Sequence, residues 1–208
     1  TKYNFLSSGG IAFANAVADA VAAHKPGSLE QLNGLKTAGG KTVADLTNDL
    51  LAKVGEKIDI RRFQAMEAKN GSVFAYTHLG SKIGVLVECS NLTSDATGTT
   101  IGRDVAMQIA AMTPLFVGKD DVDQATLQKE VEIYKAQAVN EGKPEQIAEK
   151  IAQGRLEKYY QEVCLLEQSF IKDSGKTIKD LLSDATGKVG EKIGIRRFIR
   201  YHLGESTQ

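Results

Sequence analysis

Two long stretches in the second half of the chain carry apolar residues at the spacing of a helix. Residues 124–141 place one apolar stripe on a helix, in steps of four, three and four: Leu127, Val131, Tyr134 and Ala138. Residues 144–166 do the same, with inward positions Ile147, Ile151, Leu156, Tyr159 and Val163. Gly142, Lys143 and Pro144 interrupt the pattern, which predicts an antiparallel helical hairpin. Because both helices are rich in charge, we expect the hairpin to project from the body; two helices lying flat are the alternative.

Shorter apolar runs ahead of this hairpin have the character of strands. Residues 73–78 and 82–88 are joined by the short glycine-containing connection at 79–81, which predicts a β-hairpin. A helix over residues 101–112 is predicted to follow, and Pro114 is expected to close it.

An internal repeat organises the chain. Residues 40–63 read GKTVADLTNDLLAKVGEKIDIRRF and residues 175–198 read GKTIKDLLSDATGKVGEKIGIRRF. The two segments align without a gap, and 16 of 24 positions are identical, whereas chance would give roughly one or two. The chain therefore contains two related units, each with a helix followed by a strand.

Both copies of the repeat carry signals for the ends of a helix. A threonine and an aspartate stand at the N-cap and N3 spacing, Thr42 with Asp45 and Thr177 with Asp180. Glycine accepts a left-handed C-cap, so the two helices are expected to stop at Gly55 and Gly190.

Each predicted strand of the repeat contains a pair of arginines. The strands are expected over residues 58–63 and 193–198, with Arg61–Arg62 in the first and Arg196–Arg197 in the second. Neighbouring side chains on a strand point to opposite faces. We therefore expect only one arginine of each pair to face solvent.

The segment Gly39-Gly40-Lys41-Thr42 resembles the end of a phosphate-binding loop, but its spacing is wrong. The loop requires GxxxxGK[ST], and the position of its first glycine is taken by Leu35. The second copy, at 175–177, has no upstream glycine either. The lysine and threonine are therefore assigned to the start of a helix.

Composition argues for a packed protein without a nucleic-acid-binding face. The 208 residues are 42% apolar, and 26 basic residues balance 26 acidic ones; a dedicated nucleic-acid binder needs a basic surface. Residues 11–23 are the longest apolar run, but Asn15 and Asp19 interrupt it, so an amphipathic helix is expected rather than the roughly 20 residues of a membrane span. Cys89 and Cys164 are interpreted as buried apolar residues in a reducing compartment, with a disulfide or reactive thiol as the alternative.

No group of residues has the spacing of a catalytic or metal site. None of His24, His78 and His202 has a second histidine or cysteine at metal-ligand spacing. No serine lies in a nucleophile-elbow motif, and the carboxylates lie on helix faces. The residues alone therefore indicate a binding protein, with no enzyme activity, metal or cofactor expected.

Four segments resemble the elongation factor Ts family. VGEKIDIRRF at 54–63 resembles the family's GENIxIRR signature, and YTHLGSKIGVLVE at 76–88 is similar to its β-hairpin. DVAMQIAAMTP at 104–114 looks like the helix that follows. GKPEQIAEKIAQGRLEKYYQEVCLLEQSFIKD at 142–173 is similar to the return helix of its coiled coil. The resemblance spans nearly the whole chain in the family's order.

This resemblance implies an α+β fold of two repeated subdomains, with small antiparallel sheets flanked by helices and a coiled-coil hairpin. The N-terminal core subdomain is expected over residues 1–70. The C-terminal core subdomain is expected over 71–120 and 167–208, with the hairpin inserted at 121–166. In some members the coiled coil also mediates dimerisation.

The resemblance also implies an activity and a set of contact residues. Family members bind elongation factor Tu carrying GDP and speed GDP release, without catalysing a reaction. The family's TDFV element matches Asn4, Phe5 and Leu6, where Phe5 keeps the aromatic wedge and Asn4 replaces the acid. His78 matches a partner-surface histidine, and Phe170 and Ile171 match residues that reach the partner's β-barrel region. The alternatives are a surface histidine without a role at His78 and core packing at Phe170 and Ile171.

The family's N-terminal helical domain and first two strands are expected to be absent from this chain. The strand expected at 58–66 would then lack sheet partners on its N-terminal side. A dimerisation or structural module without exchange activity is the alternative function, and RNA binding through the paired arginines is a third. The resemblance implies a bacterial cytoplasmic or organellar location, possible homodimerisation, and no membrane or direct nucleic-acid partner.

Overall fold

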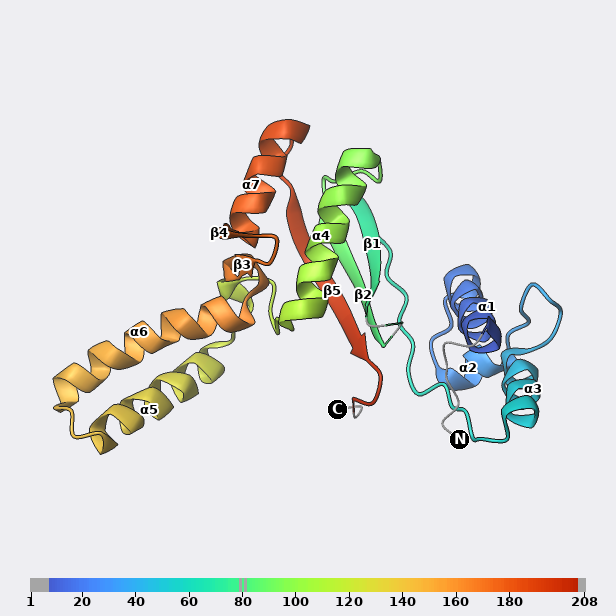
Figure 1. Cartoon of the computed structure of the whole chain (residues 1–208), viewed down its shortest axis with the longest axis horizontal. Coiled ribbons are helices and arrows are strands. Elements are labelled where there is room, and N and C mark those ends of the chain that lie inside the picture. Colours follow the sequence, from blue (N-terminus) through green and yellow to red (C-terminus); the bar gives the residue numbers. More distant parts are fainter. Residues whose placement is uncertain (1–7, 79, 81, 206–208) are drawn as a thin grey trace. The chain divides into compact units, whose positions relative to one another are not determined.

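The computed structural model describes residues 8–78, 80 and 82–205, and it divides the chain into two compact units. The first unit runs up to Met66 and includes Gly204 and Glu205, and the second is Glu67–Leu203. Figure 1 labels the elements of both units. Helices and small antiparallel sheets are combined, as an α+β fold requires.

The first unit is helical in its described residues. It contains α1 (Ser8–His24), α2 (Leu29–Gly34) and α3 (Val43–Val54). The predicted N-terminal helix is therefore confirmed, with bounds a few residues wider. Its core consists of buried side chains from all three helices: Phe13, Val17, Ala20, Val21, Leu32, Val43 and Leu50.

The strand predicted at 58–63 is wrong, and so is its extension to residue 66. The chain from Lys57 to Met66 forms no regular element, although Ile58, Ile60 and Phe63 pack against the core of the first unit. A strand requires a neighbouring strand for its backbone N–H and C=O groups. The described residues of this unit contain no such neighbour.

The second unit is built on a three-stranded antiparallel sheet in the order β1-β2-β5. The strands are β1 (Gly71–His78), β2 (Ile83–Ser90) and β5 (Gly194–His202). The predicted hairpin and the second repeat's strand are thus confirmed. The helix α4 (Ala96–Met112) packs on β1 and β2. It begins five residues before the predicted start, because the side chain of Asp95 caps it by accepting a hydrogen bond from Gly98 N at 2.8 Å.

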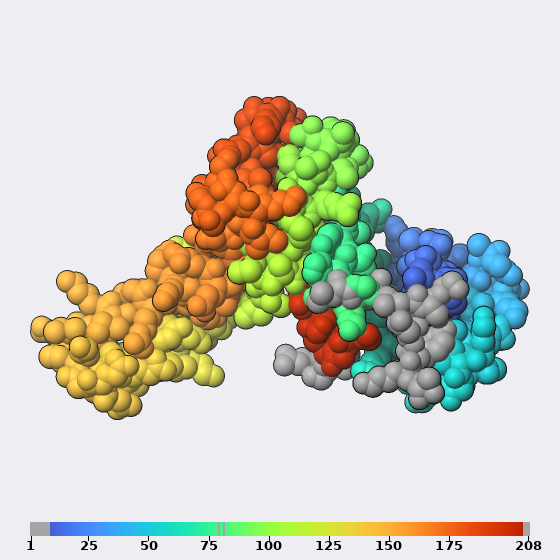
Figure 2. All heavy atoms as spheres, in the orientation of Figure 1, coloured from blue at the N-terminus to red at the C-terminus, as the bar shows by residue number. Residues whose placement is uncertain are grey.

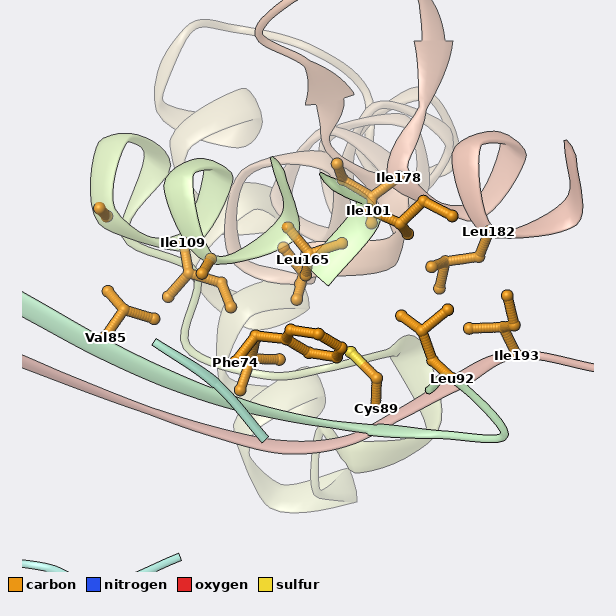
Figure 3. Close-up of a cluster of buried hydrophobic side chains, with 14 of the residues drawn as sticks. Phe74, Val85, Cys89, Leu92, Ile101, Ile109, Leu165, Ile178, Leu182 and Ile193 are labelled. Atoms are coloured by element: carbon orange, nitrogen blue, oxygen red, sulfur yellow. The ribbon is translucent and has the colours of Figure 1, made fainter. Parts of the chain in front are cut away.

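The core of the second unit lies between the sheet and two helices, α4 and α7 (Ile178–Val189). Figure 3 shows the apolar side chains of both helices facing those of the strands. The strand residues Phe74, Val85, Val87 and Cys89 are all buried there. Gly102 of α4 permits this packing, because a Cβ atom at that position would collide with the Phe74 ring.

The predicted helical hairpin is present as α5 (Gln124–Asn140) and α6 (Glu145–Val163). Figures 1 and 2 show it extending away from the sheet of the same unit, as expected from its charge. Small residues pack at the contact between the helices, where Ala138, Ala148 and Ala152 are fully buried. Lys135 pairs across the hairpin with Glu145 and Glu149, at 3.3 Å each.

Short elements join the hairpin to the sheet. The 3₁₀ turns are η1 (Lys119–Asp121) and η2 (Leu165–Glu167), and the two short strands are β3 (Ser169–Phe170) and β4 (Asp173–Thr177). The helix α6 is shorter than the predicted range of 144–166, because it ends at Val163 and η2 follows.

The expectation that only one arginine of each pair faces solvent is wrong for the second pair. Arg196 and Arg197 are both about half exposed, at 50% and 51%. The register of β2 and β5 shifts between Glu88 and Cys89, because Cys89 pairs with Ile195 and Glu88 with Arg197. Arg196 is the extra residue of this β-bulge, so both arginines lie opposite Glu88 and point to the same side.

Candidate functional site

The residues predicted to contact a partner fall into three groups. Asn4, Phe5 and Leu6 lie outside the described residues. His78 is the last residue of β1, and Phe170 and Ile171 lie in and after β3. The described candidates are therefore all in the second unit.

His78 is half-buried at the end of a row of side chains on the helix-covered face of the sheet. It pairs with Ile83, which is 5% exposed. Its Nδ1 atom lies 2.8 Å from the hydroxyl oxygen of Tyr76, two residues earlier on the same face. The hydroxyl of Tyr76 therefore holds the imidazole ring of His78 on its Nδ1 side.

Phe170 and Ile171 are neighbours in the chain but lie in different surroundings. Phe170 is 6% exposed and belongs to the core of the second unit, whereas the Ile171 residue is 42% exposed. Of the two residues, only Ile171 is therefore exposed enough to contact a partner. The following residue, Lys172, forms an ion pair with Asp104 of α4.

Two fully buried glutamines hold the turn that presents Ile171. Gln108 of α4 accepts a hydrogen bond from Ile171 N through Oε1 at 2.9 Å, and it donates through Nε2 to Ser169 O at 3.0 Å. Gln108 also donates to Oε1 of Gln168 at 3.3 Å. Gln168 in turn donates to Glu162 O at 2.8 Å, at the end of α6. The pair thus links the turn, α4 and the base of the helical hairpin.

The two lysines of the GKT segments are engaged by aspartates of the helices that follow. Lys41 Nζ lies 2.5 Å from Asp49, and Lys176 Nζ lies 2.6 Å from Asp184. The hydrogen bond that each lysine donates to its aspartate raises the pKa of the lysine. The threonines of both segments cap their helices, which confirms the assignment of these segments to helix starts.

The cysteines are buried and free, which confirms their prediction as buried apolar residues. Burial raises the pKa of the Cys89 thiol to about 12 and that of Cys164 to about 11. Neither thiol is therefore ionised near neutral pH. Among residues 8–78, 80 and 82–205, no group of three or more His, Cys, Asp or Glu side chains is arranged to hold a metal ion.

Several residues that support His78 and Ile171 were not predicted from the sequence. Tyr76 has a sequence signal, because it stands two residues before His78 in a strand and so shares its face. Gln108 and Gln168 have none, because they are 60 residues apart and meet only in the fold.

Comparison with known proteins gives consistent matches along the chain. The family model described as elongation factor TS matches residues 9–205. Elongation factor Ts of Clostridium perfringens (strain SM101) is 42% identical over 208 residues, which is 100% of this chain and 69% of that protein. Elongation factor Ts of Clostridioides difficile (strain 630) is 47% identical over 169 residues, covering 81% of this chain and 55% of that protein. No helix within the described part of the chain combines the length and apolar content needed to cross a membrane.

Proposed function

This chain belongs to the elongation factor Ts family, and on that premise we propose that it binds the GTPase elongation factor Tu carrying GDP and promotes release of the GDP. The observation that carries the proposal is the family match over residues 9–205. This range includes the β-hairpin, the helical hairpin and both copies of the repeat.

Nucleotide exchange of this kind requires a surface that binds the GTPase and does not require side chains that react chemically. A protein that weakens GDP binding to the GTPase must itself be bound more weakly when GDP is present, because the coupling between the two ligands is reciprocal. It acts by favouring the nucleotide-free GTPase. The half-buried His78 and the exposed Ile171 are the described residues suited to such contacts.

The direct test is release of a fluorescent GDP analogue from elongation factor Tu of a bacterium such as Clostridium perfringens. Acceleration that saturates with the concentration of this chain is expected. His78→Ala should slow release, while His24→Ala, an exposed histidine at the end of α1, is the matched control. Absence of acceleration by the parent chain at saturating concentration would overturn the proposal.

The wedge at Asn4, Phe5 and Leu6 is a separate part of the proposal. It rests on the match to the family's TDFV element, in which an aromatic residue enters the GTPase near its magnesium and phosphate site. Phe5→Ala should slow GDP release, and Asn4→Asp, which restores the acid, should speed it. If Phe5→Ala matched the parent protein in rate, Phe5 would not be the wedge.

Homodimerisation through the helical hairpin is the competing function, and exposed apolar side chains on the hairpin favour it. Ile133, Val139 and Ile147 are 41%, 46% and 49% exposed. Sedimentation equilibrium of the parent chain and of a variant with serine at all three positions tests it. A dimer that dissociates in the variant, together with no exchange activity, would favour this function.

We place the proposed exchange activity in the bacterial cytoplasm, since the relatives above are bacterial proteins.

A further inference from the structure

The strand β1 carries an aromatic row that ends at His78. Phe74, Tyr76 and His78 alternate along one face, opposite the buried Val87, Val85 and Ile83 of β2. Phe74 is buried at 6% exposure, and Tyr76 packs against the same core. The row thus runs from the hydrophobic core to the candidate contact surface.

Tyr76 touches His78 in two ways. The hydroxyl oxygen of Tyr76 lies 2.8 Å from His78 Nδ1. The two rings are stacked, with centroids 5.7 Å apart and planes at 26°. The guanidinium carbon of Arg103 on α4 lies 5.9 Å from the Tyr76 ring centroid. Tyr76 is therefore fixed by core packing and by Arg103, and it can in turn fix the imidazole.

The chemistry of the two groups decides the direction of the hydrogen bond. A phenol hydroxyl is a good donor, and the unprotonated nitrogen of a neutral imidazole is a better acceptor than a phenol oxygen. The hydroxyl of Tyr76 then donates to Nδ1, so the ring proton of neutral His78 lies on Nε2. In this tautomer the other side of the ring presents an N–H donor.

We propose that Tyr76 is a positioning residue for His78, and that it holds the imidazole in the Nε2–H tautomer and in a fixed orientation. His78 then offers a hydrogen-bond donor to the partner. The matching group on the partner is an acceptor, a backbone carbonyl or a carboxylate oxygen. This inference rests on the proposed function, because it assumes that His78 meets the GTPase.

The first test reads the tautomer directly and does not depend on exchange activity. Long-range ¹H–¹⁵N spectra of the imidazole, recorded on the full chain at a pH where His78 is neutral, distinguish the two tautomers. The Nε2–H form is expected in the parent chain. Tyr76→Phe keeps the ring and its packing but removes the hydroxyl, so a mixture of tautomers is expected. A parent chain with the proton on Nδ1, or an unchanged spectrum in Tyr76→Phe, would overturn the proposal.

The second test is a double-mutant cycle with GDP release as the readout. Tyr76→Phe should reduce the exchange rate at subsaturating concentration by about threefold to tenfold, as expected for one hydrogen bond. The same change in a His78→Ala background should have no effect. Equal losses in both backgrounds would assign Tyr76 a packing role and overturn the proposal.

Tyr160→Phe on the helical hairpin serves as the matched control, since its ring lies against Lys119 rather than a histidine. Thermal unfolding of each variant identifies losses that come from folding. If the parent chain fails to accelerate GDP release, the proposed function fails, while the spectra still decide whether Tyr76 holds the imidazole.

Discussion

Residues 54–63 and 189–198 read VGEKIDIRRF and VGEKIGIRRF, and they differ only at Asp59 and Gly194. In the second unit this sequence leads into β5, which pairs with β2 along its length. In the first unit it forms no strand. The difference indicates that the strand depends on an available neighbour more than on its own residues.

The helices of the two copies behave alike. Both α3 and α7 are 12 residues long, begin with a threonine–aspartate capping box and end at a left-handed glycine, with φ of 74° at Gly55 and 85° at Gly190. Every one of these interactions lies within the repeat. The parts of the repeat that are stabilised locally are therefore reproduced, and the part that needs distant residues is not.

The helices α1 and α4 extend the comparison beyond the repeat. ANAVADAVAAHKP at 14–26 and GRDVAMQIAAMTP at 102–114 are identical at five of 13 positions. Both helices are followed by a non-glycine residue in the left-handed region, Lys25 with φ of 47° and Thr113 with φ of 48°, and then by proline. Their exposure differs along one face. Gly102, Ala106 and Ala110 are buried, whereas the corresponding alanines of α1 are exposed: Ala14, Ala18 and Ala22.

The largest effect is expected where α4 meets the sheet. Gly102→Val would place side-chain atoms in the Phe74 ring, and it should lower the free energy of unfolding of the second unit by about 3 kcal/mol. The matched change in α1, Ala14→Val, is at an exposed position and should cost no more than about 0.7 kcal/mol through helix propensity. Urea unfolding measures both. Equal losses would show that the two faces are equivalent.

The next effect is expected at Gln108, whose counterpart in α1 is Ala20. Gln108→Ala leaves Ile171 N and Ser169 O without their present partner, at a cost of about 2 kcal/mol. Hydrogen exchange should show that the Ile171 amide loses protection, while amides in the middle of β2 keep it. Unchanged exchange at Ile171 would contradict the role assigned to the glutamine.

A smaller, pH-dependent effect is expected at Glu88. Arg197 donates a hydrogen bond to the carboxylate at 2.7 Å, which lowers the pKa of Glu88, with Lys69 N as a further donor. A lowered pKa in the folded state stabilises the protein above the ordinary glutamate pKa of 4.5, and this stabilisation is lost as pH falls below it. Glu88→Gln should therefore lower stability at pH 7, and the difference from the parent should shrink below about pH 4.5.

The corresponding carboxylate of the first unit provides the control for this prediction. Arg62 is the repeat counterpart of Arg197, and its guanidinium lies 3.7 Å from Glu205, whose side chain is 40% exposed compared with 2% for Glu88. Glu205→Gln should change stability less than Glu88→Gln at pH 7. Urea unfolding across pH 3 to 8 measures both, and a larger effect at Glu205 would contradict the assignment.

The helix caps should give equal effects in the two copies. Thr42→Ala and Thr177→Ala each remove a side-chain acceptor for an N3 amide, at 3.1 Å and 3.2 Å, and each should cost about 1 kcal/mol. Hydrogen exchange within α3 and α7 resolves the two units separately. A loss in only one copy would show that tertiary contacts, rather than the cap, stabilise that helix.

The smallest effect is expected from exchanging the one residue that differs within the shared sequence. Gly194→Asp makes residues 189–198 identical to 54–63, and an added Cβ would lie 2.9 Å from Ser90 Oγ, which can rotate away. The strand β5 should persist at a cost below about 1 kcal/mol. Loss of amide protection throughout β5 would assign the difference between the copies to this residue instead of to the neighbouring strand. Asp59→Gly, the reverse change, should not create a strand.

The features that could be predicted from sequence are the ones with a local signal. The capping boxes, the glycine stops, the β-hairpin and the helical hairpin each occupy a short stretch, and their spacing identifies them. The strand at 58–63 and the exposure of Arg196 and Arg197 were predicted wrongly. In the first case a strand needs a neighbouring strand, and the described residues of the first unit contain none. In the second case a β-bulge changes the alternation of faces. The candidate site residues could be predicted only from their match to the motifs of the family. The hydrogen bond to His78 and the buried pair of Gln108 and Gln168 depend on the fold.

The helical hairpin also has a mechanical consequence. With 17 residues in α5 and a rise of about 1.5 Å per residue, it is a lever arm about 25 Å long. Its base is held by residues 115–117, where Leu115 N and Phe116 N donate to Val163 O, and by Gln168. A rotation of about 10° at this base would displace the tip by about 4 Å over that length. The stiffness of a few hydrogen bonds at the base thus limits how far the tip of the hairpin can move relative to the core of its unit.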